Sequence, residues 1–161
     1  MDIRPVQASD AAEWLRMRLA LYDESTSDNE GDEIRRYLAG STRSDLPTLH
    51  AAFVCTRPDG GLCGVVEVSI RPYADGCETN HVGYLEAWYV DDDWRGRGVG
   101  RALVAAAEEW AVVQGCLEMA SDTDLTNIVS QRAHARLGFE EVGRVVQFCK
   151  LIGSTAINRK E

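Results

Sequence analysis

The sequence predicts an α/β domain in which helices pack on the faces of one mixed β-sheet. The chain has 161 residues, which is enough for one domain with a sizeable core. Its 45% of hydrophobic residues is ordinary for a soluble globular protein. Strand and helix patterns follow one another as β-α-α-β-β-β-α-β-α-β, without repeats or an internal linker. We therefore expect a single domain over residues 1–153 and a polar tail over residues 154–161.

The N-terminal part is expected to form a strand and two helices, over residues 1–7, 9–22 and 33–40. Asp10 and Glu13 have the spacing of a capping box at the start of the first helix. Residues 23–33 contain almost no apolar side chain, which is typical of a loop or the edge of a lid. The second helix is short and should end at Gly40.

Three strands should follow, over residues 48–56, 62–71 and 82–90. The first two are β-rich runs joined by "RPDGG", which strongly indicates a hairpin. Residues 72–81 are rich in turn formers and are expected to be a loop. Glu67 alternates with valines in the second strand, so we expect it on the solvent face or at an edge of the sheet.

The C-terminal part should read helix, strand, helix, strand, over residues 99–114, 116–122, 126–138 and 140–152. The first of these has the best helix pattern of the chain, and Gly115 should end it. Its expected apolar side carries Leu103, Ala106, Trp110 and Val113.

Charge and cysteine content narrow the class of protein. The net charge is −9 and the pI is near 4.8, which disfavours sequence-independent nucleic-acid binding. Such acidity suits a cationic partner, or simply solubility. The five cysteines contain no C-x-x-C pair and lie mostly in apolar runs, so we expect reduced thiols rather than disulfides or a metal site. No apolar run or signal peptide points to a membrane, and a cytoplasmic protein is expected.

The stretch "DDDWRGRGVGRALV", residues 91–104, combines a strand end, a glycine-rich turn and the start of a helix. Helix N-termini bind anions through free N–H groups, and glycines let the backbone come close to the ligand. The glycines do not have the dinucleotide spacing G-x-G-x-x-G, and no G-K-[ST] follows. The pattern present is Arg95-x-x-Gly98-x-Gly100, and a plain surface turn with two arginines is the alternative interpretation.

This pattern resembles the pyrophosphate-binding motif of the GNAT acetyltransferase superfamily, which binds coenzyme A. Asn127, His134 and "LGF" at residues 137–139 lie at the offsets that the superfamily uses after it. The superfamily most often has tyrosine where His134 stands. The histidine can still donate a proton, or it can simply pack on a helix face.

The sequence is also similar to the aminoglycoside 6'-N-acetyltransferases over almost everything up to Gly153. The matching stretches include "EVSIRPYADGCETNHVGYLEAWYV", "ASDTDLTN", "HARLGFEE" and "RVVQF". The resemblance implies a mostly antiparallel sheet with helices on both faces, a homodimer, acetyl-CoA as donor and no metal. It also implies that acetyl-CoA is held by Trp88, Tyr89, Val90, Arg95, Gly96, Arg97, Gly98, Val99, Gly100, Arg101 and Asn127.

The same resemblance implies that the antibiotic is bound by Tyr22, Tyr73, Glu86 and Asp122. Relatives often have tryptophan at the place of Tyr22 and a carboxylate at that of Gly143. Carboxylates would attract the ammonium groups of an aminoglycoside, and one of them, or a water that it holds, would serve as base. We expect Asp122, Glu86 and His134 to take part in catalysis. An outward-facing position for Glu86 and a helix N-cap for Asp122 are the alternatives.

Two other functions remain open from the sequence. An acetyltransferase for polyamines or protein N-termini would use the same donor site and also take a cationic acceptor. A GNAT-fold binding module without turnover is the second alternative.

Overall fold

The sheet has five strands in the order β1-β2-β3-β4-β5. The computed structural model describes residues 1–21, 27–40, 50–150 and 152. Neighbouring strands are antiparallel from β1 to β4, and β5 is parallel to β4. The predicted mixed, mostly antiparallel sheet is thus confirmed. The strands are β1 (Asp2–Pro5), β2 (His50–Thr56), β3 (Leu62–Arg71), β4 (Val82–Val90) and β5 (Glu118–Ser121).

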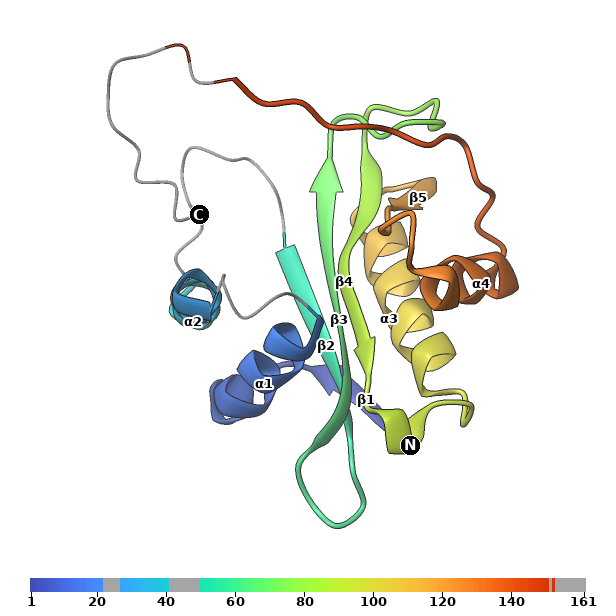
Figure 1. Ribbon diagram of the computed structural model, residues 1–161. Coiled ribbons are helices and arrows are strands. Elements are labelled where there is room, and N and C mark those ends of the chain that lie inside the picture. Colours follow the sequence, from blue (N-terminus) through green and yellow to red (C-terminus); the bar gives the residue numbers. More distant parts are fainter. Residues whose placement is uncertain (22–26, 41–49, 151, 153–161) are drawn as a thin grey trace.

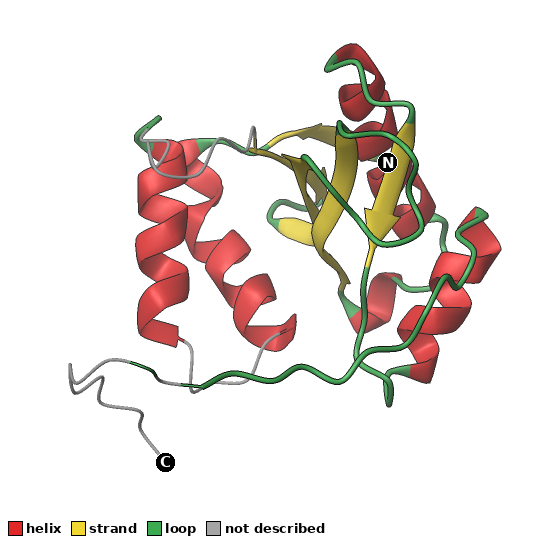
Figure 2. Cartoon of the chain, turned by 90° about the horizontal axis from the view of Figure 1, so that it is seen from above, coloured by secondary structure: helices red, strands yellow, loops and turns green. Residues whose placement is uncertain are grey.

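Helices cover both faces of the sheet (Figures 1 and 2). On one face, Trp14 and Met17 of α1 pack with Val54 and Val65 of the sheet. On the other face, Leu103 of α3 belongs to a buried cluster with strand residues such as Val66 and Val68. The helices are α1 (Ala11–Leu21), α2 (Ser27–Leu38), α3 (Val99–Val113) and α4 (Ile128–Leu137).

The start of α1 differs from the prediction. Asp10 does not cap the helix, because a 3-10 turn (Ala8–Asp10) precedes α1 and moves the cap position back to Gln7. The Asp10 carboxylate accepts the Gln7 backbone N–H at 2.8 Å and pairs with Arg4 at 2.7 Å. Asp10 therefore joins the helix start to β1.

Helix α2 begins earlier than predicted, and helix α3 buries a different side from the one predicted. The predicted loop over residues 23–33 is wrong from Ser27 onward, where α2 begins. This polar helix buries Ile34 and packs on α1, and such tertiary contact stabilises helices that the local sequence alone does not indicate. In α3 the buried side is Leu103, Val104, Ala107 and Ala111, and Val113 is exposed, contrary to expectation.

The predicted C-terminal strand is not formed in the described part of residues 140–152. Residues 139–150 lie outside any helix or strand and cross from the α4 side toward the α1/α2 side, past the end of the sheet (Figure 1). The apolar side chains that suggested a strand, Val142, Val145, Val146 and Phe148, are all exposed. Within the described residues, β5 pairs on one side only, so its outer edge has no neighbouring strand.

The hairpin of β2 and β3, the loop over residues 72–81 and the bounds of β4 are as predicted. No helix in the described part of the chain is long and apolar enough to cross a membrane.

Candidate active site

Strands β4 and β5, at one edge of the sheet, separate partway along β4. Their pairing ends at Leu85 and Ser121, while β4 continues to Val90. Just beyond this point β4 carries a bulge. Val68 of β3 faces Leu85 and Glu67 faces Ala87, which leaves Glu86 as the extra residue. The bulge turns Glu86 toward the side where β3 presents Ser69 and Arg71.

Beyond the bulge, the side chains of β4 point to opposite faces. Trp88 lies against Gly100 of α3 and meets the ring of His134 edge-on at 5.4 Å. Tyr89 packs with the α1 cluster on the other face. The expected contact of one ligand with Trp88, Tyr89 and Val90 therefore fits the backbone edge of β4, but not all three side chains.

The glycine-rich turn before α3 leaves space at the helix N-terminus. Gly96 and Gly98 have φ values of +73° and +84°, and a Cβ on either would have no atom within 4 Å. Such open backbone beside free N–H groups suits an anion. Gly100 differs, because a Cβ there would come within 2.8 Å of the Trp88 ring. Its role is close packing of α3 on β4.

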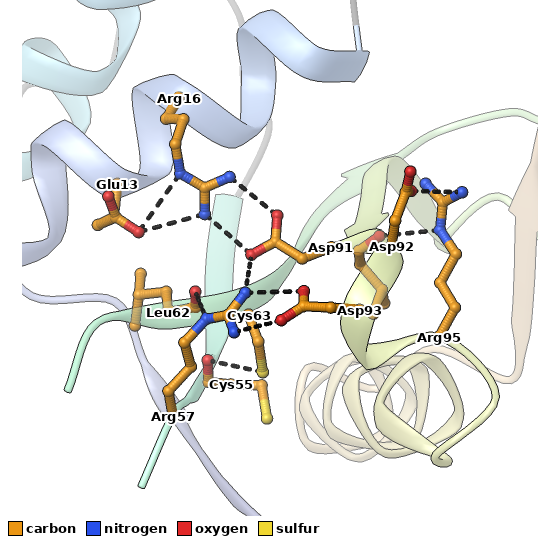
Figure 3. Close-up of polar contacts among 11 residues, drawn as sticks. Glu13, Arg16, Cys55, Arg57, Leu62, Cys63, Asp91, Asp92, Asp93 and Arg95 are labelled. Carbon is orange, nitrogen blue, oxygen red and sulfur yellow. Dashed lines mark hydrogen bonds and ion pairs between the residues drawn. The ribbon is translucent and has the colours of Figure 1, made fainter. Parts of the chain in front are cut away.

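The three aspartates before the turn are bound by arginines (Figure 3). Asp91 accepts hydrogen bonds from Arg16 of α1 at 2.8 Å and from Arg57 at 2.7 Å. Arg57 also binds Asp93 at 2.8 Å, and Asp92 pairs with Arg95 at 2.7 Å. We call Arg16, Arg57, Asp91 and Asp93 the arginine clamp.

The arginine clamp fixes the chain where β4 leaves the sheet. Asp91 is buried, and its N–H donates to the Cys63 carbonyl of β3. Burial opposes ionisation of this carboxyl, but the hydrogen bonds from Arg16 and Arg57 hold its pKa below the usual value. The aspartates thus position the turn and are not themselves directed at a ligand.

The arginine side chains in and after the turn lie at the protein surface. Arg95 donates from Nε to the Val90 carbonyl at 3.0 Å, and the Arg97 guanidinium lies 5.1 Å from the Trp94 ring centroid. Arg101 is exposed on the first turn of α3. Val99 is buried and packs in the core, so only its backbone faces the turn.

Glu86 and Asp122 both lie close to Arg71 and Tyr84, and we call these four side chains the acidic bay. Within this group Glu86 is already paired. Arg71 binds it through Nη2 at 2.5 Å and Nε at 3.0 Å, and the Ser69 hydroxyl also donates to it. The Glu86 side chain is 28% exposed, so it is neither buried in the core nor fully in solvent. Sequence reasoning missed Arg71, because cross-strand pairing depends on the bulge.

Asp122 is exposed one residue beyond β5. It does not cap the next helix, because Asn127 does so by accepting the Ser130 N–H at 3.0 Å. Burial, and then the negative charge and hydrogen bonding of Asp122, raise the pKa of Tyr84 to about 12. Asp122, Tyr84, Arg71 and Glu86 are therefore neighbours. Asn127 acts as a cap here, and this local role explains its position.

His134 has partners for both ring nitrogens. Nδ1 lies 2.9 Å from the Ser130 carbonyl oxygen, which can only accept, so Nδ1 carries the proton. A neutral ring then accepts at Nε2 from the Ser121 hydroxyl, 3.0 Å away. The ring also meets Phe139 edge-on at 5.3 Å. His134 thus packs on other side chains, as in the alternative interpretation. It also contacts Ser121, where β4 and β5 separate.

The remaining predicted residues are less tightly placed. Tyr73 is 67% exposed and donates its hydroxyl hydrogen to Asp75. Tyr22 lies outside the described residues. Gly143, where the resemblance leads us to expect a carboxylate, is exposed, and the nearby Glu141 pairs with Arg144 at 2.7 Å.

Glu67 is the clearest error of the sequence interpretation. It is fully buried, and it accepts a hydrogen bond from Trp14 Nε1 at 2.6 Å and pairs with Arg18 at 2.9 Å. Glu67 therefore joins α1 to β3 beneath the bulge and faces neither solvent nor the bay.

Residues 13–139 match the Acetyltransferase (GNAT) family. The chain belongs to the GNAT acetyltransferase family. Enzymes of this family use acetyl-CoA, and the space at Gly96 and Gly98 fits its diphosphate. The splayed strands and the turn before α3 are thus parts of a GNAT domain.

Curated relatives of this GNAT chain are aminoglycoside N(6')-acetyltransferases type 1. The one from Klebsiella aerogenes is 45% identical, over 92% of this chain and 95% of its own length. The one from Stenotrophomonas maltophilia is 40% identical, over 91% and 90%.

Solved structures agree with this relationship and confirm the GNAT fold. AAC(6')-Iy, in complex with the bisubstrate analog CoA-S-monomethyl-acetylneamine, is 34% identical with a TM-score of 0.81, over 93% of this chain and 97% of its own. The apo 6'-N-acetyltransferase AAC(6')-IG from Acinetobacter haemolyticus is 34% identical with a TM-score of 0.83, over 95% and 100%.

Proposed function

We propose that this protein transfers the acetyl group of acetyl-CoA to the 6'-amino group of aminoglycoside antibiotics and so confers resistance. The observation that carries this proposal is the likeness, over almost the whole chain, to AAC(6')-Iy, which binds an analog that joins CoA to an acetylated aminoglycoside. An anion site at the turn before α3 and an acidic bay at the bulge of β4 are the two features that such a reaction needs.

The donor is held by the turn and by the edge of β4. The backbone N–H groups of residues 96–101 and the charges of Arg95, Arg97 and Arg101 bind the diphosphate. The free edge of β4 over Trp88–Val90 receives the acyl arm, and its N–H groups stabilise the negative charge that develops on the thioester oxygen. His134 contacts the Trp88 ring and the Ser121 hydroxyl and positions both.

The acceptor binds on the acidic side of the bulge. The Asp122 carboxylate binds the ammonium group of the aminoglycoside. Directly or through a water molecule, it then takes the proton that this group must lose before it attacks. Glu86 contributes negative charge beside it, and Tyr73 offers an exposed ring to the sugar. Attack by the neutral amine forms the C–N bond and breaks the C–S bond of the thioester. The proton that the nitrogen then loses passes to solvent or to the CoA thiolate, which is stable enough to leave with little help from an acid.

A panel assay of thiol release tests the proposal. The wild-type enzyme is given acetyl-CoA with kanamycin-type drugs, spermidine or a peptide, and the acetylated drug is located by mass spectrometry and NMR. Fast turnover of the drugs at the 6' amine supports the proposal. Faster turnover of spermidine or the peptide establishes the polyamine or N-terminal alternative. Binding of acetyl-CoA without any product establishes the non-catalytic module.

The arginine clamp should control donor affinity. Asp91→Asn removes the charge that holds Arg16 and Arg57 together, so the turn before α3 loses part of its fixed position. A loss of about 1 kcal/mol of binding raises KM for acetyl-CoA about fivefold. Steady-state kinetics should show this, with KM for the drug unchanged. The exposed Asp59→Asn should change neither constant. An equal rise of both KM values would contradict this role.

We also propose that the enzyme is a homodimer in which each copy supplies residues 140–150 to the other. The segment has strand-like apolar side chains that are exposed, and the outer edge of β5 has no neighbour in the described chain. If residues 140–150 of one copy paired with β5 of the other, the exposed apolar side chains and the outer edge of β5 would both be covered. A cytoplasmic location is part of the proposal, and it is supported by acetyl-CoA as substrate and by the free cysteines of the described residues.

Light scattering after size-exclusion chromatography tests the dimer. The wild type should elute with twice the 17.8 kDa mass of the chain. Val146→Glu/Phe148→Glu places two charges on the exchanged segment and should give a monomer. The matched Glu140→Gln should remain a dimer. A monomeric wild type would refute the exchange.

A further inference from the structure

The acidic bay contains a cation supplied by the protein itself. Arg71, the last residue of β3, makes a two-point ion pair with Glu86, at 2.5 and 3.0 Å. Its guanidinium carbon also lies 3.4 Å from the centroid of the Tyr84 ring, a close cation–π contact. The guanidinium thus occupies a place where Glu86 would otherwise meet an ammonium group.

The charges around Arg71 keep this cation in the bay. Burial works against its ionisation, but hydrogen bonding to Glu86 and the charges of Glu86 and Asp122 raise the pKa of Arg71. With two carboxylates and one guanidinium, the bay has a net charge of minus one instead of minus two. Arg71 therefore weakens the attraction of the bay for any cation that enters.

Tethering makes Arg71 an effective competitor. A group on the same chain acts at an effective concentration in the millimolar range, which a dilute monoamine cannot match. A polycation can, because it binds Asp122 and other carboxylates through further ammonium groups at the same time. Arg71 is 37% exposed, so its guanidinium can turn to solvent without opening the core.

We propose that Arg71 is a specificity-determining residue that admits polycationic acceptors and excludes amines with a single charge. This inference rests on the proposed function, since it takes the acidic bay as the acceptor site. Acceptors are thus selected by their ability to displace the Arg71 guanidinium from Glu86, and not by the shape of the acidic bay.

The test compares two acceptors that share the reacting group. One is kanamycin, and the other is methyl 6-amino-6-deoxy-glucoside, which carries that amine alone. In Arg71→Gln the ratio of kcat/KM for the monoamine to kcat/KM for kanamycin should rise about tenfold, a shift of about 1.4 kcal/mol. Arg71→Met, which can still pack on Tyr84, should shift it in the same direction. Arg71→Lys retains the charge and should keep the ratio near that of the wild type.

Controls separate this role from a structural one. Arg132→Gln removes an exposed positive charge on α4 and should leave the ratio unchanged. If the folded Gln and Met variants lose activity on both acceptors in equal proportion, Arg71 only positions Glu86 and the inference is wrong.

The wild-type panel keeps the proposed function separate from this inference. Without turnover of kanamycin, the proposed function fails, and the ratio is measured between spermidine and propylamine. The same tenfold shift toward the monoamine supports Arg71 as the selecting residue for that reaction. An unchanged ratio refutes it.

Discussion

Asp122→Asn is expected to lower kcat for aminoglycoside acetylation by about a hundredfold, because a positioned general base contributes at least that much. The substrate amine is protonated at neutral pH and attacks only after losing a proton. Asp122 is exposed one residue past the point where β4 and β5 separate, and its charge reaches Tyr84 and Arg71. Asparagine keeps the shape of the side chain and removes its capacity to take a proton.

Steady-state rates at saturating acetyl-CoA measure the effect, and thermal unfolding shows whether the variant keeps its fold. Glu108→Gln removes a carboxylate from the exposed side of α3 and should leave kcat unchanged. A slow rate that recovers as pH rises toward the pKa of the amine would support the role of Asp122 as base. A rate within twofold of the wild type would exclude it.

His134→Ala should cost less than Asp122→Asn. Its two ring nitrogens are engaged by Ser130 and Ser121, so it has no proton directed at a ligand. The leaving thiol has a pKa of roughly 8.5 if it resembles cysteine, and needs little protonation to depart. The reverse order of the two variants would make His134 the more important catalyst.

Local signals in the sequence were enough to predict much of the fold. The hairpin of β2 and β3, strand β4 and helix α3 each have a clear period and a turn or glycine at the end, so their patterns do not depend on distant residues. The turn at residues 96–100 was found for the same reason. The proposed anion site therefore rests on a turn that the sequence alone predicts.

Features that depend on distant partners were not predictable. The polar helix α2 needs its contact with α1, and residues 140–150 have a strand pattern without a strand in the same chain to pair with. The pairing of Arg71 with Glu86 requires the bulge in β4, and that of Arg57 with Asp91 requires the register of three strands. Hydrophobic periodicity shows which residues of one element share a face, but not which charged side chains of different elements form ion pairs.

Glu67→Gln should destabilise the fold by about 3 kcal/mol, since the Arg18 charge loses its buried partner and retains only the half-exposed Glu33. Glu67 is fully buried, and Arg18 is 10% exposed and binds it at 2.9 Å. Glutamine can still accept the hydrogen bond of Trp14, so the change isolates the charge. Urea unfolding should show a lower midpoint at an unchanged slope. The exposed Glu109→Gln should stay within about 0.5 kcal/mol of the wild type.

A double variant decides whether the charge or the packing matters. Glu67→Leu/Arg18→Met removes both ions and fills a similar volume, and it should recover most of the lost stability, because a buried ion pair adds little over apolar packing. Arg18 also binds Glu33 of α2 at 3.0 Å, so part of the loss can persist. If the double variant is less stable than Glu67→Gln alone, the ion pair itself stabilises the contact of α1 with β3. The pair would then fix the position of α1 on β3 next to the bulge, and the buried charge would serve the geometry of the site.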